Sequence, residues 1–206
     1  MKIVYKLTDS EMRTHRGFQW ELGKWYKTTE KGKFCSSGWL HFYSDPLVGL
    51  FLNPVHMDIR NFHLFRAEVE GNFIDNNGLN CGYSRAKLVE ELPVPQISPV
   101  QRVRFAIFCV KEVYKEKEWN KWADNWLLGK DRTIMKAWNK DCTKDATNAA
   151  IAAYAFYANN VPGATLQQRI AEIATYTAES VAESVASATK SKKIDLIRIA
   201  RKAMKN

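Results

Sequence analysis

The stretch Leu92-Pro-Val-Pro-Gln-Ile-Ser-Pro99 separates two parts of the chain that are built from different residues. Three prolines at such short spacing exclude a continuous helix or a central strand and keep the backbone extended. Before this stretch, aromatic and β-branched residues alternate with turn-forming residues. After it, alanines and aliphatic residues recur at helical spacing, most clearly from Ile134 to Ala203. The change predicts two modules, over residues 1–95 and 99–206.

The first half predicts a small α+β domain with a mainly antiparallel sheet. Asp75-Asn-Asn-Gly78 is a strong turn sequence. Asp45 followed by Pro46 predicts the start of a short helix, with Asp45 as the N-cap and Pro46 at the first helical position. Short segments rich in β-branched and aromatic residues are expected as strands at residues 2–7, 23–27, 39–43, 62–69 and 87–92.

The second half predicts an all-α bundle of about five helices. Ser98 is expected to cap a helix that begins with Pro99. In the next helix, Trp119, Trp122 and Trp126 lie on one face. We expect these indoles in the core, with a stacking platform for bases as the alternative. The remaining helices are expected over residues 133–159, over residues 166–189 after a cap at Thr165, and after a cap at Ser191.

Length and composition are those of an ordinary globular protein. The 206 residues are enough for one domain or for two of roughly 100 residues each. The apolar runs are far shorter than the roughly 20 residues of a spanning helix, and a charge follows Met1 too early for a signal sequence. The four cysteines are widely spaced, which predicts neither a disulfide framework nor a metal site. We therefore expect a cytoplasmic protein without membrane contact and without a cofactor.

Positive charge is concentrated near the C-terminus. The net charge is +9; residues 1–98 hold 12 Lys and Arg against 11 Asp and Glu, and residues 99–206 hold 19 against 11, which gives +1 and +8. Residues 190–206 contain seven cations and the single anion Asp195. Such a segment attracts phosphate groups or an acidic protein surface. The alternative is a solvated helix end whose cations complement the helix dipole.

Several motifs of the first half occur in a fixed order: Tyr5-Lys-Leu-Thr-Asp9, Gly17-Phe-Gln-Trp-Glu21, Gly38, His41-Phe42, Asp45-Pro46 and Phe65-x-x-Glu68-Val69. In order and spacing they resemble the leading domain of a phage and prophage family of unknown function, over roughly residues 3–92. The chain departs from that family at Trp39-Leu40, where the family has one residue, and at Tyr43, which replaces a frequent Cys. The resemblance implies a phage accessory protein.

The helical half is similar to a family of helical immunity proteins. The residues that resemble it are Phe105-Ala-Ile-Phe-Cys109, Glu112-Val113 and Trp122-Ala-Asp-Asn-Trp126. Together, the two resemblances imply a phage-encoded protein that binds and blocks a host defence protein or toxin in the host cytoplasm. Its oligomeric state stays open.

An enzyme is the first alternative. On a strand, His41 and Tyr43 are expected to point to the same side. Together with Tyr5, Thr8 and either Glu68 or Glu70, they are similar to the His-Tyr-Glu arrangement of mono-ADP-ribosyltransferases. There, histidine and tyrosine hold the dinucleotide and glutamate orients the acceptor. The order fits poorly, because that family's histidine lies on the first strand, where Lys6 or Thr8 stands here. An active transferase and a degenerate module that binds nucleotide both remain open, although a protein without catalytic residues is favoured.

Nucleic-acid binding through the basic tail is the second alternative. The tail lacks interleaved aromatic residues, and helix-turn-helix, zinc and RNP patterns are absent from the sequence. A protein partner is therefore favoured over a nucleic acid. The expected contact residues are Trp39, His41, Tyr43 and Glu68 in the first half, and Arg198, Arg201 and Lys202 in the tail. The cations of the tail would mainly raise the association rate with an acidic partner.

Overall fold

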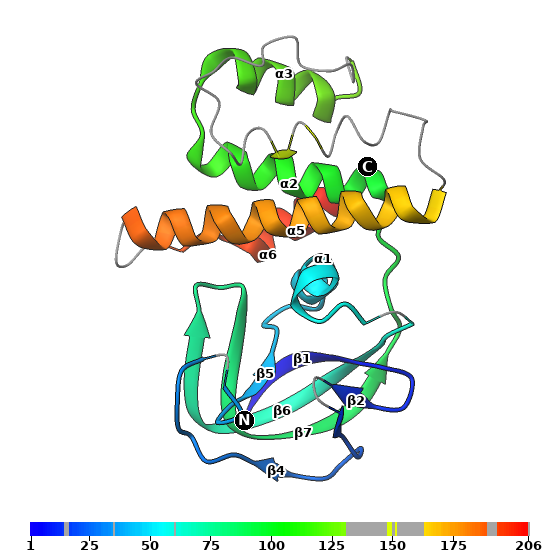
Figure 1. Cartoon of the computed structure of the whole chain (residues 1–206), viewed down its shortest axis with the longest axis vertical. Coiled ribbons are helices and arrows are strands. Elements are labelled where there is room, and N and C mark those ends of the chain that lie inside the picture. The colour runs from blue at the N-terminus through cyan, green and yellow to red at the C-terminus, as the bar shows by residue number, and fades with distance from the viewer. Residues whose placement is uncertain are drawn as a thin grey trace. The chain divides into compact units, whose positions relative to one another are not determined.

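The computed structural model describes residues 1–14, 17–34, 36–59, 61–130, 148–149, 151, 163–188 and 193–205. An antiparallel sheet region is followed by helices, as in an α+β protein (Figure 1). The chain divides into two compact units, Met1–Gln96 and Ile97–Asn206. The boundary lies in the proline-rich stretch that interrupts regular structure.

The first unit contains a curled antiparallel sheet and one helix. Its elements are β1 (Lys2–Thr8), β2 (Arg13–Thr14), β3 (Phe18–Gln19), β4 (Tyr26–Lys27), β5 (Leu40–Phe42), α1 (Pro46–His56), β6 (His63–Asn76) and β7 (Asn80–Leu92). β6 pairs with β1 on one edge and with β7 on the other; β7 pairs in turn with β5 and β4. Tyr43, the residue after β5, forms a further antiparallel pair with Tyr5 of β1. The sheet therefore closes on itself, with β1, β6, β7 and β5 around one interior.

The β6–β7 hairpin is longer than the sequence predicts. The expected strand over residues 62–69 continues to Asn76, and the expected strand over residues 87–92 begins at Asn80. The register shifts between Glu70 and Phe73, where Gly71 has a φ of +82°. Such a bulge lets the strand bend and continue through polar residues that a period-two pattern does not recognise. The predicted turn is confirmed, with Asn77 and Gly78 both at positive φ.

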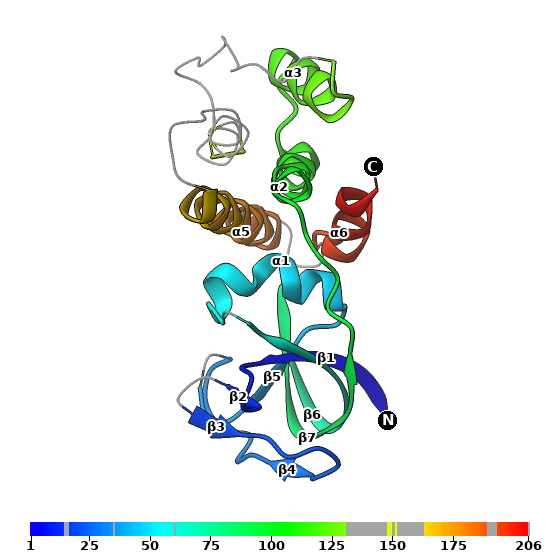
Figure 2. The same ribbon diagram turned by 90° about the vertical axis from the view of Figure 1, so that its right-hand side faces the viewer.

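Helix α1 begins as the sequence predicts. The Asp45 carboxylate accepts a hydrogen bond from the Leu47 N–H at 2.9 Å, and Pro46 is the first helical residue. In Figure 2, α1 lies beside β1 over one end of the curled sheet. The interior of the sheet is filled by apolar side chains of the strands and by Trp20, which follows β3. The strand residues of this core include Val4, Leu40, Phe42, Phe65, Ala67, Val69, Tyr83 and Leu88.

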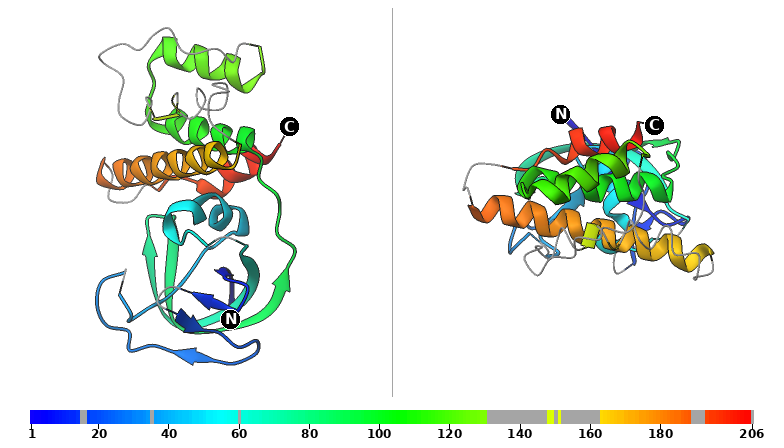
Figure 3. Two further views of the ribbon diagram at one scale, coloured as in Figure 1. Left: turned by 45° about the vertical axis from the view of Figure 1, so that its right-hand side comes forward. Right: turned by 90° about the horizontal axis from the view of Figure 1, so that it is seen from above.

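The described part of the second unit is helical, with α2 (Pro99–Val113), α3 (Lys117–Leu127), α5 (Gly163–Ala188) and α6 (Leu196–Met204). Helix α2 lies between α5 and α6, which Figures 2 and 3 show from two sides. The predicted cap at Ser98 is confirmed as a complete capping box with Gln101. Of the helix expected over residues 133–159, residues 148, 149 and 151 are described, and they are helical. The cap expected at Thr165 is wrong, because α5 begins at Gly163 and Thr165 lies inside it. The last helix begins at Leu196 and not directly after the expected cap at Ser191, a residue outside the described positions. The described N-cap of α6 is Asp195.

The three tryptophans of α3 differ in burial. Trp119 and Trp126 are fully buried, which confirms the core interpretation for these two indoles. Trp122 is half-buried, and its ring lies 5.7 Å from that of Trp119. A stacking platform needs exposed rings, so Trp119 and Trp126 cannot form one in this conformation. Helical periodicity places residues on one face, but it does not say which edge of that face is covered.

Candidate functional site

His41 lies at the centre of β5, with its ring turned away from the interior. Its Nε2 lies 2.5 Å from the carbonyl oxygen of Phe34, and the two rings meet edge to face at 4.8 Å. Nε2 therefore carries the proton, and its N–H donates a hydrogen bond to this carbonyl. Burial lowers the pKa of His41 below 6.5, against the opposing effect of the Phe34 carbonyl. The ring is thus neutral at pH 7, and Nε2 serves to hold the loop before β5.

Tyr43 follows β5 and points toward α1. Its side chain is 4 % exposed, and its hydroxyl lies 3.2 Å from Nδ1 of His56. The two rings are stacked, with centroids 5.9 Å apart. A Cβ atom at Gly49 would lie 2.7 Å from the Tyr43 ring, so glycine at this position lets the helix approach. Tyr43 therefore packs within the unit and does not offer a contact surface in this conformation.

Glu68 belongs to a row of ion pairs across β6 and β7. Its Oε2 forms an ion pair with the Lys87 ammonium, at 2.9 Å. The neighbouring rungs of the row are Arg66–Glu90 at 2.9 Å and Arg85–Glu70. Directly opposed opposite charges stabilise such strand pairs. Glu68 thus has a structural partner in the sheet.

The contacts of the expected site residues lead to different places. On β7, Lys87 pairs with Glu68 and Gly82 pairs with His41. These two β7 residues are five positions apart, which corresponds to about 16 Å along a strand. The indole N–H of Trp39 donates to the Gly32 carbonyl at 3.2 Å and so belongs to the loop before β5. The contacts of His41 with Phe34, of Tyr43 with His56 and of Glu68 with Lys87 therefore differ from the arrangement of an ADP-ribosyltransferase.

Lys6 is the residue in this unit that sequence analysis did not select. It lies on β1 between Val4 and Thr8, on the face that points to the interior, and is 6 % exposed. Its ammonium donates to the His41 carbonyl at 2.6 Å. The rings of Phe42 and Trp20 lie 5.2 and 5.6 Å from Nζ. Burial lowers the pKa of Lys6 to about 8, and the nearby thiol of Cys81 opposes this.

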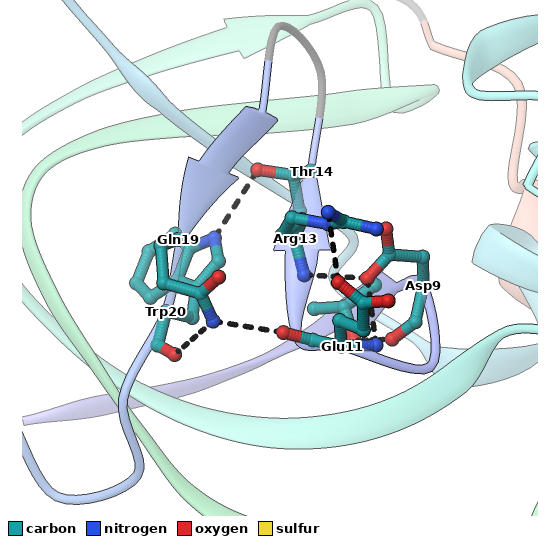
Figure 4. A network of polar contacts seen from close by, with 7 residues as sticks. Asp9, Glu11, Arg13, Thr14, Gln19 and Trp20 are labelled. Carbon is teal, nitrogen blue, oxygen red and sulfur yellow. Dashed lines mark hydrogen bonds and ion pairs between the residues drawn. The ribbon is translucent and has the colours of Figure 1, made fainter.

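Trp20, whose ring lies over the Lys6 ammonium, is bonded to the segment after β1. Figure 4 shows the polar contacts of this segment. The Asp9 carboxylate accepts from the backbone N–H groups of Arg13 and Glu11 at 2.8 and 2.9 Å. The first of these bonds is the main reason why the pKa of Asp9 lies below its usual value. The indole N–H of Trp20 donates to Thr14 Oγ1 at 3.2 Å. Trp20 itself is 1 % exposed, so this loop holds a ring over the buried amine.

The cysteines of the described residues are inert. Cys81 and Cys109 are buried and unbridged. Burial raises the pKa of Cys81 to about 11 and raises that of Cys109 further, which disfavours the reactive thiolate. Across the described ranges, no three His, Cys, Asp or Glu side chains are grouped so that they could hold a metal ion.

The expected contact residues of the tail lie on α6. Arg198 pairs with Glu112 at 2.6 Å and lies 3.8 Å from Asp195. The Lys202 ammonium lies 4.3 Å over the ring of Phe108, while the residue stays exposed, as does Arg201. The opposite face of α6 is buried, with Leu196, Ile199, Ala200 and Ala203 as its apolar residues. The tail is therefore an amphipathic helix with a cationic outer face.

Comparison with known proteins concerns mainly the first unit. Residues 2–98 match the model of a domain of unknown function, DUF7666. Neither the curated proteins nor the solved structures contain a match to the chain. The description of the family names no function, so the phage origin and the resemblance to immunity proteins stay predictions. In the described ranges, no helix combines the length and the apolarity needed to cross a bilayer.

Proposed function

We propose that this protein is a phage-encoded accessory factor that counteracts a host defence protein or a toxin by binding it in the host cytoplasm. The sequence resemblances motivate the biological setting. The observation that supports binding best is the outer face of α6, where Arg201, Lys202 and Lys205 are exposed together. The separate structural partners of His41, Tyr43 and Glu68 favour binding over catalysis by these residues.

The cationic face is held rigidly by the packing of α6 on α2. The two helices run in opposite directions, since Gln101 at the start of α2 donates to the Met204 carbonyl at 3.2 Å and Glu112 near its end pairs with Arg198. Helix α6 therefore cannot turn its cations inward without losing its apolar contacts. A rigid surface loses little conformational entropy when a partner binds.

The cations of α6 are not equivalent. The charge of Arg198 is opposed by Glu112 and Asp195, and these contacts raise its pKa. The Lys202 ammonium lies over the ring of Phe108, while the residue stays exposed at the surface. Among the cations expected from the sequence, Lys202 is therefore a better candidate than Arg198, and the exposed residues Arg201 and Lys205 accompany it. An acidic protein surface is the complementary partner.

Charge reversal tests this proposal. The variant Arg201→Glu, Lys202→Glu and Lys205→Glu is compared with Lys27→Glu, Lys31→Glu and Lys33→Glu, which makes the same change in net charge at exposed positions of the first unit. Tagged proteins are recovered from infected cells, and the bound proteins are quantified by mass spectrometry with and without nuclease. Plating efficiency on the defended host is measured in parallel.

We expect the α6 variant to lose the partner and the protection of the phage, while the control variant keeps both. Equal capture by the two variants would contradict the role of α6. Capture that disappears after nuclease treatment, with a steep loss of affinity as salt is raised, would favour the nucleic-acid alternative. Transfer of label from a labelled dinucleotide, lost in a His41→Ala variant, would favour the enzyme.

A further inference from the structure

The seam between β1 and β5 is the weakest line in the closed sheet. One residue pair joins the two segments: Tyr5 N–H donates to Tyr43 O at 2.8 Å, and Tyr43 N–H donates to Tyr5 O at 2.9 Å. Hydrogen-bonded pairs alternate along antiparallel strands, so the next pair in this register would be Leu7 with His41. The His41 carbonyl instead accepts from the side chain of Lys6 at 2.6 Å. A lysine ammonium thus replaces a backbone donor where the strands separate.

The surroundings of Lys6 make this replacement costly when the amine is charged. Phe42 and Trp20 offer ring faces to the ammonium, and the His41 carbonyl is neutral. Among the described residues, the titratable groups that interact with its charge are Cys81 on β7 and His41 on β5, and Cys81 in turn interacts with Lys2 and Asp75. Neither Cys81 nor His41 is a carboxylate. Cation–π contacts offset only part of the lost hydration of an ammonium.

We propose that Lys6 is a pH-dependent latch on the β1–β5 seam, which closes more firmly as its amine loses a proton. Local opening breaks the Tyr5–Tyr43 pair, lets water reach Nζ and frees the His41 carbonyl. The charged amine gains hydration in the open seam, whereas the neutral amine keeps its hydrogen bond at little desolvation cost in the closed one. This proposal is independent of the proposed partner of α6.

The direction of the effect follows from the pKa of Lys6, about 8 in the closed seam against an ordinary value of 10.5. The open seam binds more protons, so the closed fraction rises with pH across this interval. Between pH 6.5 and 9.0, the two values give a decrease of about tenfold in the opening equilibrium. The neighbouring groups titrate outside this window: the pKa of His41 is lowered from 6.5, that of Lys2 is raised from 10.5, and that of Cys81 is about 11.

Hydrogen exchange of the full chain, followed by mass spectrometry, measures the opening. Exchange is recorded from pH 6.5 to 9.0, with times corrected for the intrinsic pH dependence, in peptides that contain Tyr5 and Tyr43. We expect protection of these peptides to rise about tenfold in the wild-type protein. Protection should not change with pH in Lys6→Met. It should rise as in the wild type in Lys24→Met, which removes an exposed lysine of the same unit.

Flat protection in the wild-type protein, or an equal rise in Lys6→Met, would overturn the latch. If Lys6→Met does not fold, the wild-type protein still decides the question through NMR titration of its lysine side chains. A Lys6 amine that titrates near pH 8 supports the latch, and one that titrates at or above 10.5 refutes it.

Discussion

The two units place their lysines in opposite ways. In the sheet unit, Lys6 points into an apolar interior, where burial lowers its pKa to about 8. In the helical unit, Lys202 also lies over an aromatic ring, yet its ammonium remains at the surface and covers Phe108. The ring contacts are similar, but the access to water is not. Burial, more than the presence of a ring, therefore decides whether a lysine stabilises its unit or costs stability.

The largest change in stability is expected in the apolar core of the helical unit, whose described part contains no buried lysine like Lys6. Trp119→Ala should lower the free energy of unfolding by about 3–5 kcal/mol, because the indole is fully buried and its removal leaves a large cavity. The matched change is Trp122→Ala, at a half-buried indole of the same helix, and we expect a clearly smaller loss. Urea unfolding of the full chain, followed by circular dichroism, measures both. Equal losses would show that the two rings are equally enclosed.

In the sheet unit, removal of the buried charge should stabilise the protein. Lys6→Met keeps the apolar stem and should raise the free energy of unfolding at pH 7 by about 1–3 kcal/mol, the desolvation cost less one hydrogen bond to the His41 carbonyl. Because the folded pKa of Lys6 is lowered, the advantage of the variant over the wild-type protein should shrink as the pH rises from 8 to 10.5. The raised pKa values of the buried thiols Cys81 and Cys109 act in the opposite sense, but they are common to both proteins and cancel in this difference. Denaturant unfolding at pH 7 and pH 10 checks both signs. A destabilised variant with unchanged pH dependence would contradict this account.

The capping box of α2 gives a smaller effect. Ser98→Ala should lower the free energy of unfolding by about 1 kcal/mol, since Ser98 Oγ accepts from the Gln101 N–H at 3.3 Å and Gln101 reaches back to the Ser98 N–H at 2.8 Å. Thermal unfolding of the full chain measures the loss. The variant Ser98→Asp keeps an acceptor at the N-cap and should unfold close to the wild-type temperature. A similar loss in both variants would mean that the side-chain oxygen does not cap the helix.

The smallest effect is expected in the row of ion pairs on β6 and β7. Glu68→Gln should change the free energy of unfolding by less than about 1 kcal/mol, because its pair with Lys87 is only partly buried. Glu90→Gln, in the adjacent rung with Arg66, is the matched control. If Glu68→Gln alone removes partner capture or dinucleotide transfer while stability is unchanged, Glu68 has a role beyond the sheet.

Local sequence signals predicted the ends of several elements. The caps at Asp45 and Ser98 and the turn at Asn77-Gly78 are all confirmed. Each depends on hydrogen bonds or dihedral angles within a few residues, so the chain needs no distant partner to form them. The short pairs β2 and β3 were not predicted, because two-residue strands have too few residues to show a period. The full lengths of β6 and β7 were also not predicted, since a bulge at Gly71 interrupts the alternation of apolar and polar residues.

The candidate site was less predictable than the elements. Sequence reasoning selected His41, Tyr43 and Glu68 for their chemistry, and the structure gives each a separate partner in Phe34, His56 and Lys87. It passed over Lys6, although the alternation of Val4, Lys6 and Thr8 along β1 was a usable sign of an inward lysine. A lysine at a core position of a strand is rare enough to merit attention.

By itself, the sequence determined the order of a sheet unit and a helical unit, their boundary at three prolines, and the caps that begin α1 and α2. These features depend on proline geometry, residue period and contacts between near neighbours. Only the tertiary structure decided that β5 returns to β1 through Tyr5 and Tyr43, and that Lys6 is enclosed there against the His41 carbonyl. Closure brings together residues about 35 positions apart, and their burial depends on every strand around the interior, which no local pattern contains.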